Sequence, residues 1–202
     1  MLGERPGGFS VLIGFNKPYG VICQFSPSGD KPTLKNFIDL PDIYPAGRLD
    51  TDSEGLLLLT DDGVLQARIA DPMHKLAKTY WAQVDGAPTD ADLAALRAGV
   101  NLGDFVTQPA QARIIAEPKG LWERDPPVRF RKLIPTTWLE IIITEGKNRQ
   151  VRRMTAKIGF PTLRLVRAAI GNLALADLKV GTWRQLEVPA ALMRRAKAGK
   201  KP

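Results

Sequence analysis

The hydrophobic residues of this chain fall into short segments that mostly predict β-strands. Leu56–Leu59 is a continuous run of four leucines, a pattern typical of a buried strand. Lys78–Val84 alternates apolar and polar residues instead, which is the period of a strand with one buried face. The other strand-like segments are 11–15, 20–24, 109–116, 137–144, 163–170, 173–176 and 182–186.

Capping residues and hydrophobic spacing predict fewer helices than strands. The clearest helix spans 89–99, where Thr89 precedes an acidic first turn and Gly99 follows the last apolar residue. Further helices are predicted over 33–38, 63–70, 148–159 and 189–197, while 41–55 should be irregular. Because strands outnumber helices and do not alternate with them regularly, we expect an α+β fold with a mixed or antiparallel sheet.

Composition fits one folded domain or two closely joined lobes. The chain has 202 residues, of which 44% are hydrophobic and 25% charged. No apolar run approaches the roughly 18 residues that cross a bilayer, and the N-terminal residues lack the pattern of a signal peptide. The only cysteine is Cys23, which fits a reducing compartment. We therefore expect a cytoplasmic protein without membrane attachment.

Charge and scarce residue types narrow the possible functions. Lys+Arg 29 against Asp+Glu 21 gives a net charge of +8, which favours a polyanionic partner such as nucleic acid. One histidine, His74, and one cysteine are too few for the usual zinc sites. The sequence contains neither a nucleophile elbow nor a phosphate-binding glycine loop. Any catalysis should therefore depend on carboxylates, arginine, lysine and tyrosine.

An acidic turn within residues 45–63 is the most informative segment. It holds three alternating acids followed by a glycine: Asp50, Asp52, Glu54 and Gly55. This spacing matches the first half of an EF-hand calcium loop, but residues 43–47 cannot form the incoming helix. Paired carboxylates could also serve a glycosidase, which needs them about 5–10 Å apart. Both functions remain alternatives at this point.

A second informative segment is the predicted helix over 148–159. Val151, Met154 and Ile158 share one face at helical spacing and should pack in the core. The other side is basic and contains no acid. The cluster of seven basic residues comprises Lys147, Arg149, Arg152, Arg153, Lys157, Arg164 and Arg167. We interpret this unrelieved charge as a phosphate-binding surface.

Smaller features are explained by packing when each is taken alone. Lys78 and Tyr80 should point to the same face of their strand, as an ordinary half-buried pair would. His74 and Cys23 are expected to be structural. Trp122 falls in a predicted loop, where it could stack on a base.

Together these segments resemble the pseudouridine synthases. Within that family the similarity is to the ribosomal subgroup that contains the small-subunit enzyme and the large-subunit enzymes B, E and F. The matching blocks are Asn16-Lys17-Pro18-Tyr19-Gly20-Val21, Gly47-Arg48-Leu49-Asp50 with Ser53 to Gly63, Lys78-Thr79-Tyr80, Glu145 to Met154, and Leu165 to Leu186. The resemblance covers about residues 12–187.

The resemblance implies a fold and a domain organisation. The fold would be the α+β pseudouridine synthase fold, a mixed and mostly antiparallel sheet in two lobes around a central active-site cleft. We expect one catalytic domain over 1–202, with lobes of approximately 8–75 and 76–190 and a basic tail over 194–202. Because the first block begins at Asn16, we expect no separate N-terminal RNA-binding domain. In this respect the chain is most similar to large-subunit enzyme E, which is similarly short.

The resemblance also implies an activity and the residues that perform it. The reaction would isomerise a specific uridine to pseudouridine in 23S ribosomal RNA or a large-subunit precursor, by a monomer without metal or cofactor. Asp50 would be the catalytic aspartate, Arg152 its cationic neighbour, and Tyr80 the catalytic residue that stacks on the target base and assists proton transfer at C5. Arg48 would hold the flipped nucleotide. The remaining RNA contacts are expected from Lys17, Lys78, Lys147, Arg149, Arg153 and Lys157. A catalytically silent RNA-binding protein of the same fold is the rival hypothesis.

Overall fold

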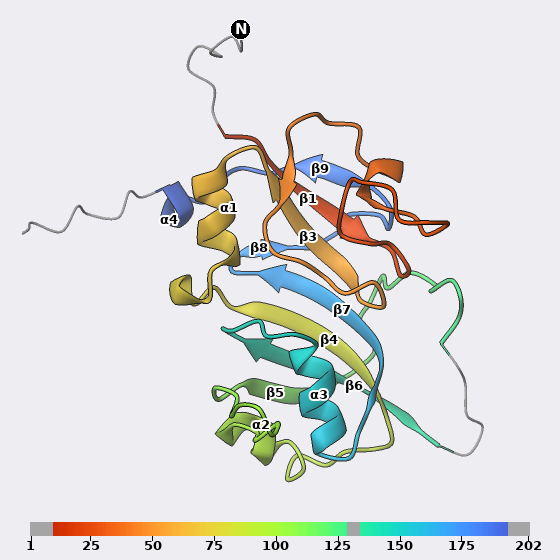
Figure 1. The fold of residues 1–202 in the computed structure, drawn as a ribbon. Helices are drawn as coiled ribbons and strands as arrows, with labels where there is room; N and C mark the ends of the chain where they lie inside the picture. The colour runs from red at the N-terminus through yellow and green to blue at the C-terminus, as the bar shows by residue number, and fades with distance from the viewer. Residues whose placement is uncertain (1–9, 129–133, 194–202) are drawn as a thin grey trace, which may run out of the picture.

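A mixed sheet of nine strands organises the molecule (Figure 1). The computed structural model describes residues 10–128 and 134–193. Seven strands follow the order β5-β6-β4-β7-β3-β1-β9, while β2 pairs with β3 and β8 with β7. The strands are β1 (Leu12–Lys17), β2 (Tyr44–Pro45), β3 (Glu54–Thr60), β4 (Lys78–Asp85), β5 (Gln111–Ile115), β6 (Thr136–Ile143), β7 (Thr162–Ile170), β8 (Leu173–Ala174) and β9 (Trp183–Gln185). The helices are α1 (Gly63–Ala70), α2 (Ala94–Ala98), α3 (Gln150–Lys157) and α4 (Ala190–Met193), with 3-10 turns η1 (Leu34–Asn36) and η2 (Pro72–His74).

One parallel pairing joins the two halves of the sheet. Strands β3 and β7 run parallel and pair only at Glu54 with Val166 and at Gly55 with Arg167. The other strand pairs are antiparallel. The predicted α+β class with a mixed, mostly antiparallel sheet is thereby confirmed.

Gly55 permits the close approach of β3 to β7 at this junction. Its φ is +98°, and a Cβ at this position would lie 2.5 Å from the carbonyl oxygen of Arg167. A larger residue would therefore clash with backbone and also adopt a strained conformation. The glycine that suggested a calcium loop is explained by this packing.

The leucine run is buried on both faces of the sheet. Leu57 and Leu59 belong to one hydrophobic cluster, which also contains Met154 of α3. Leu56 and Leu58 belong to another, which contains Leu65 and Ile69 of α1. All four leucines are at most 1% exposed. The run is continuously apolar because its alternate side chains pack into two hydrophobic clusters, one on each face of the sheet.

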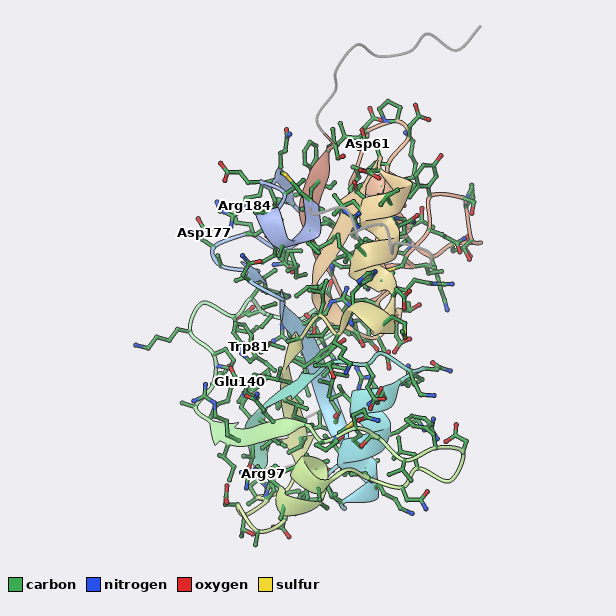
Figure 2. The ribbon with its side chains drawn as sticks, turned by 90° about the vertical axis from the view of Figure 1, so that its left-hand side faces the viewer. Asp61, Trp81, Arg97, Glu140, Asp177 and Arg184 are labelled. Atoms are coloured by element: carbon green, nitrogen blue, oxygen red, sulfur yellow. The ribbon has the colours of Figure 1, made fainter. Side chains whose placement is uncertain are left out.

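Most predicted elements form close to their expected bounds. Helix α1 begins after Asp62, whose carboxylate accepts hydrogen bonds from the backbone N–H groups of Val64 and Leu65. The predicted helix over 148–159 is shorter at both ends and forms α3. Cross-strand partners Trp81 and Glu140 lie on the side of the sheet away from α3 (Figure 2).

Three predictions differ from the structure. Residues 20–24 do not form a strand, because Ile22 makes only an isolated bridge to Thr33. The helix predicted over 89–99 is reduced to α2, since Thr89 and Asp92 bond to each other in a turn that precedes it. Strand β9, placed in the second predicted lobe, pairs with β1 in the first half of the sheet.

The C-terminal part of the chain is described only to Met193. The predicted last helix begins as α4, and its remaining residues and the basic tail over 194–202 lie outside the described residues. Within the described ranges, no helix has the length and apolar character needed to cross a membrane.

Candidate active site

A pocket of about 750 Å³ opens where the 46–53 loop meets β4, β7 and the start of α3. This volume is within the range of small-molecule sites, about 300–1,000 Å³. The pocket is lined by most of the residues predicted from the sequence to be functional: Arg48, Asp50, Lys78, Tyr80, Lys147 and Arg149. It therefore brings together four segments that are distant in the sequence.

Asp50 occupies a tight turn in the 46–53 loop. Its backbone carbonyl accepts a hydrogen bond of 3.0 Å from the Ser53 N–H, and the Thr51 carbonyl accepts one of 2.8 Å from Gly20. The side chain of Asp50 is 39% exposed, so its carboxylate can be reached from the pocket. The nearest cation is Arg149, whose Nη1 lies 3.7 Å from Asp50 Oδ2.

Arg149 binds the neighbouring carboxylate more tightly than it binds Asp50. It stands immediately before α3 in the left-handed conformation, with φ 51°. Its guanidinium donates hydrogen bonds of 2.9 and 2.7 Å to the two carboxylate oxygens of Asp52. These bonds, followed by the charges of Arg152 and Arg149, hold the pKa of Asp52 below its ordinary value.

Arg152 also binds the 46–53 loop, through Asp52. Its Nη2 donates a 2.6 Å hydrogen bond to the backbone carbonyl of Asp52, and its Nε lies 3.5 Å from Asp52 Oδ2. Nη1 donates to the Thr162 carbonyl on β7. The contacts of Arg152 are therefore with Asp52 and β7, while Arg149 is the cation beside Asp50.

Lys17 does not face the pocket, although we expected it to bind RNA. Its side chain is fully buried, and its Nζ donates to the carbonyls of Pro18 and Val21 at 2.9 and 2.8 Å. A longer contact of 3.5 Å reaches the Thr51 carbonyl, next to Asp50. Burial lowers the pKa of Lys17 to about 8. The prediction that Lys17 contacts RNA is wrong, because its ammonium group is buried and donates its hydrogen bonds to these backbone carbonyls.

Lys78 and Tyr80 line the pocket from the same face of β4, as the strand period predicted. Both are 8% exposed. Arg167 of β7 pairs with Tyr80 across the strands and also lines the pocket. Burial, and then the charge of Arg167, lowers the pKa of Lys78.

The sequence predicted a basic cluster without nearby acids, and this prediction is wrong. Distant segments supply the missing acids: Asp52 binds Arg149, Asp104 binds Arg153, and Glu54 binds Arg164. Lys147 packs its ammonium 4.5 Å from the centre of the Phe105 ring. Lys157 is exposed at the end of α3. Charge on this surface is therefore much more compensated than the local sequence indicated.

Sequence reasoning missed a buried ion pair at the β3–β7 junction. Glu54 is 0% exposed and accepts two hydrogen bonds of 2.9 Å from Arg164. The Trp122 indole N–H donates a third, also at 2.9 Å, which explains this tryptophan by packing. With Asp52 and Glu54 committed to arginines, the acidic turn does not form the calcium loop considered above. The described residues contain no group of three or more His, Cys, Asp or Glu side chains that could hold a metal ion.

The apolar walls of the pocket were also not singled out from the sequence. Leu165, Ile143 and Ile170 line it beside Tyr80. The only available signal was the alternation along their strands, which does not distinguish a pocket wall from the core. Chemically, the site offers an accessible carboxylate, a flat aromatic ring and buried cations in one cavity.

Comparisons with known proteins agree on one family. The family model described as RNA pseudouridylate synthase matches residues 11–157. A protein of Vibrio vulnificus named ribosomal large subunit pseudouridine synthase E is 58% identical over 179 residues, covering 89% of this chain and 76% of that protein. A protein of Xanthomonas campestris with the same name is 58% identical over 176 residues, covering 86% of this chain and 94% of its own length.

A solved structure supports the same conclusion at the level of fold. The crystal structure of a pseudouridylate synthase superposes with a TM-score of 0.73 at 31% sequence identity. The match covers 89% of this chain and 71% of that one.

Proposed function

The chain belongs to the RNA pseudouridylate synthase family, and we propose that it isomerises a specific uridine of large-subunit (23S) ribosomal RNA in the pocket around Asp50. The observation that carries this proposal is the accessible Asp50 carboxylate in a nucleotide-sized cavity with Tyr80. Four relatives named ribosomal large subunit pseudouridine synthase E are 56–59% identical to this chain. Their similarity supports large-subunit ribosomal RNA as the substrate.

The reaction breaks the bond between ribose C1′ and uracil N1, turns the base, and joins C1′ to C5. A proton leaves C5 and one is gained at N1, so no atom is added and no redox partner is needed. Asp50, as an anion, attacks C1′ or stabilises its positive charge. Arg149, at 3.7 Å, orients the carboxylate, and the Asp52–Arg152 contacts fix the loop that carries it.

The target nucleotide must leave the RNA stack to reach Asp50, which costs a few kcal/mol. We assign Tyr80 to stacking on the extruded base, an interaction worth about 1–3 kcal/mol. Arg48 is exposed at the pocket and is the residue positioned to hold the flipped nucleotide. Contacts of Lys147 and Lys157 with the RNA backbone would supply further binding energy, whereas Arg149 and Arg153 are already bound to Asp52 and Asp104.

The charge of the chain supports a large polyanionic substrate. A net charge of +8 attracts RNA and steers its association. We propose that the protein works as a monomer in the cytoplasm, where ribosomal RNA is assembled into subunits, and that it uses no cofactor.

A genetic experiment tests the function and identifies the uridine. Pseudouridines are mapped in ribosomal RNA from cells that lack the protein and from cells that express the wild-type chain or the Asp50→Asn variant. We expect one or a few large-subunit sites to lose modification, and only the wild-type chain to restore them. Identical maps in all strains would contradict the proposed function.

A further inference from the structure

Two buried cations line the pocket, and neither has an acidic partner in the part of the chain that the structure describes. Lys78 is 8% exposed and Arg167 is 3% exposed, and both line the cavity. Arg167 donates to the carbonyls of Leu56 and Arg48 at 2.8 and 3.3 Å. Within residues 10–128 and 134–193, the one hydrogen bond of Lys78 Nζ is a long contact of 3.4 Å with the Leu76 carbonyl. Among the residues that the structure describes, no carboxylate forms an ion pair with either cation.

The other buried or partly buried arginines near the site are neutralised. Arg164 is paired with Glu54 and Arg149 with Asp52. Burying a charge without a partner is costly, and two like charges together cost more. Arg167 Nη2 is buried and has no hydrogen-bond partner. The pocket therefore carries a positive charge that folding alone does not balance.

This charge lies where the target base is expected. Lys78 and Tyr80 are two residues apart on one face of β4, so their backbones are separated by about 7 Å. The long lysine side chain can cover part of that distance. A base stacked on Tyr80 would therefore present one edge to the ammonium group of Lys78.

Uracil becomes negatively charged during the reaction. When the C1′–N1 bond breaks, both of its electrons go to N1, and the charge spreads over the ring to the carbonyl oxygens O2 and O4. The charge disappears when C5 uses this electron pair to bond to C1′; the C5 proton then leaves and N1 gains one. Charge that develops only during the reaction is what a fixed cation in a low-dielectric site stabilises best.

We propose that Lys78 is a further catalytic residue, which donates a hydrogen bond to a uracil carbonyl oxygen and stabilises the uracil anion that forms when the glycosidic bond breaks. The proposal rests on the pseudouridine synthase function above. Lys78 keeps its proton throughout, so it adds no step to the proton balance. Arg167 is a positioning residue, because it holds the Arg48 carbonyl and adds positive charge behind Lys78.

The proposed role of Lys78 in stabilising the uracil anion is tested by substituting Lys78 and comparing uridine with a base that leaves more easily. Lys78→Met removes the charge and keeps most of the side-chain volume, and Lys119→Met is a charge-matched control at an exposed position outside the site. Single-turnover consumption of the target nucleotide is measured on RNA that contains uridine or 5-fluorouridine. Fluorine acidifies the ring, so the fluorinated base leaves more easily as an anion.

We expect Lys78→Met to slow the consumption of uridine by about 10²-fold or more, the effect of removing an oxyanion donor. The defect should be at least tenfold smaller with 5-fluorouridine, and RNA affinity should stay near that of Lys119→Met. Lys78→Arg, which restores the charge, should recover part of the rate and guards against misfolding. Equal defects on both substrates, or a loss confined to affinity, would overturn the proposal. If the wild-type chain left uridine unchanged, the proposed function itself would fail.

Discussion

Arg149 and Asp52 are 97 residues apart in the sequence, yet two hydrogen bonds of 2.9 and 2.7 Å join the guanidinium to both oxygens of the carboxylate. The same guanidinium lies 3.7 Å from Asp50. This pair therefore connects the start of α3 to the 46–53 loop, which carries Asp50. The position of Asp50 depends on an acid that does not itself take part in the proposed chemistry.

Asp52→Asn should reduce the rate of isomerisation more than it reduces RNA binding. Asparagine keeps the size of the side chain but loses the paired contact with Arg149, so Asp50 is less firmly placed. A small displacement of a catalytic group can cost about 10²-fold in rate. Single-turnover assays measure the effect, with Asp104→Asn as the control, because Asp104 makes a similar pair with Arg153. Equal effects of both substitutions on rate would count against the positioning role.

The same pair predicts how stability depends on pH. The pKa of Asp52 in the folded protein is lowered, chiefly by its hydrogen bonds from Arg149. Its contribution to the free energy of unfolding is therefore present above the unfolded-state pKa of about 3.9 and is lost as the pH falls further. Urea unfolding should separate wild type from Asp52→Asn at pH 7, and the difference should shrink toward pH 3. A difference that does not change with pH would contradict this assignment.

The buried pair at the β3–β7 junction should matter for stability. Glu54→Gln still accepts the Trp122 N–H but leaves the Arg164 charge buried without compensation. Breaking a buried ion pair in this way costs about 3–5 kcal/mol. Glu140→Gln is the control, because its partner Arg113 is 69% exposed and such pairs contribute under about 1 kcal/mol. Urea unfolding of both variants gives the comparison, and similar small losses would show that the junction does not depend on Glu54.

Local signals in the sequence predicted the elements whose causes are local. The Asp62 cap, the leucine run and the alternation through Lys78 and Tyr80 each formed as expected, because capping, burial and strand period act over a few residues. The same signals failed where a side chain of another segment intervened. Residues 20–24 are not a strand, since the Lys17 ammonium and the Thr51 carbonyl take up their backbone groups.

The charged residues of the site show more clearly what the local sequence cannot predict. Arg149, Arg153 and Arg164 looked unpaired because their acids lie about 50 to 110 positions away in the chain. Lys17 belongs to a matching block, but a block cannot say whether its lysine faces solvent or the core. Only the fold, which brings β3, β7 and α3 together, decides which cations remain available to RNA.

Salt dependence of RNA binding should distinguish the available cations from the compensated ones. Lys157 is exposed at the end of α3, whereas Arg153 is already bound to Asp104. Lys157→Ala should therefore flatten the dependence of log K on log salt by about 0.7, the value for one single-strand phosphate contact. Arg153→Ala should change the slope less. Filter binding over a range of salt concentrations measures both, and the reverse order would show that RNA displaces Asp104 from Arg153.

The most direct test of the account is single-turnover isomerisation by Asp50→Asn on the ribosomal RNA segment that the mapping experiment identifies. The amide keeps the shape of the side chain but has no negative charge, so pseudouridine should fall to background while RNA binding persists. Asp42→Asn carries the same substitution in an exposed turn with φ 56°, which asparagine tolerates, and should react at the wild-type rate. Pseudouridine formation by Asp50→Asn near the wild-type rate would contradict the assignment of the active site.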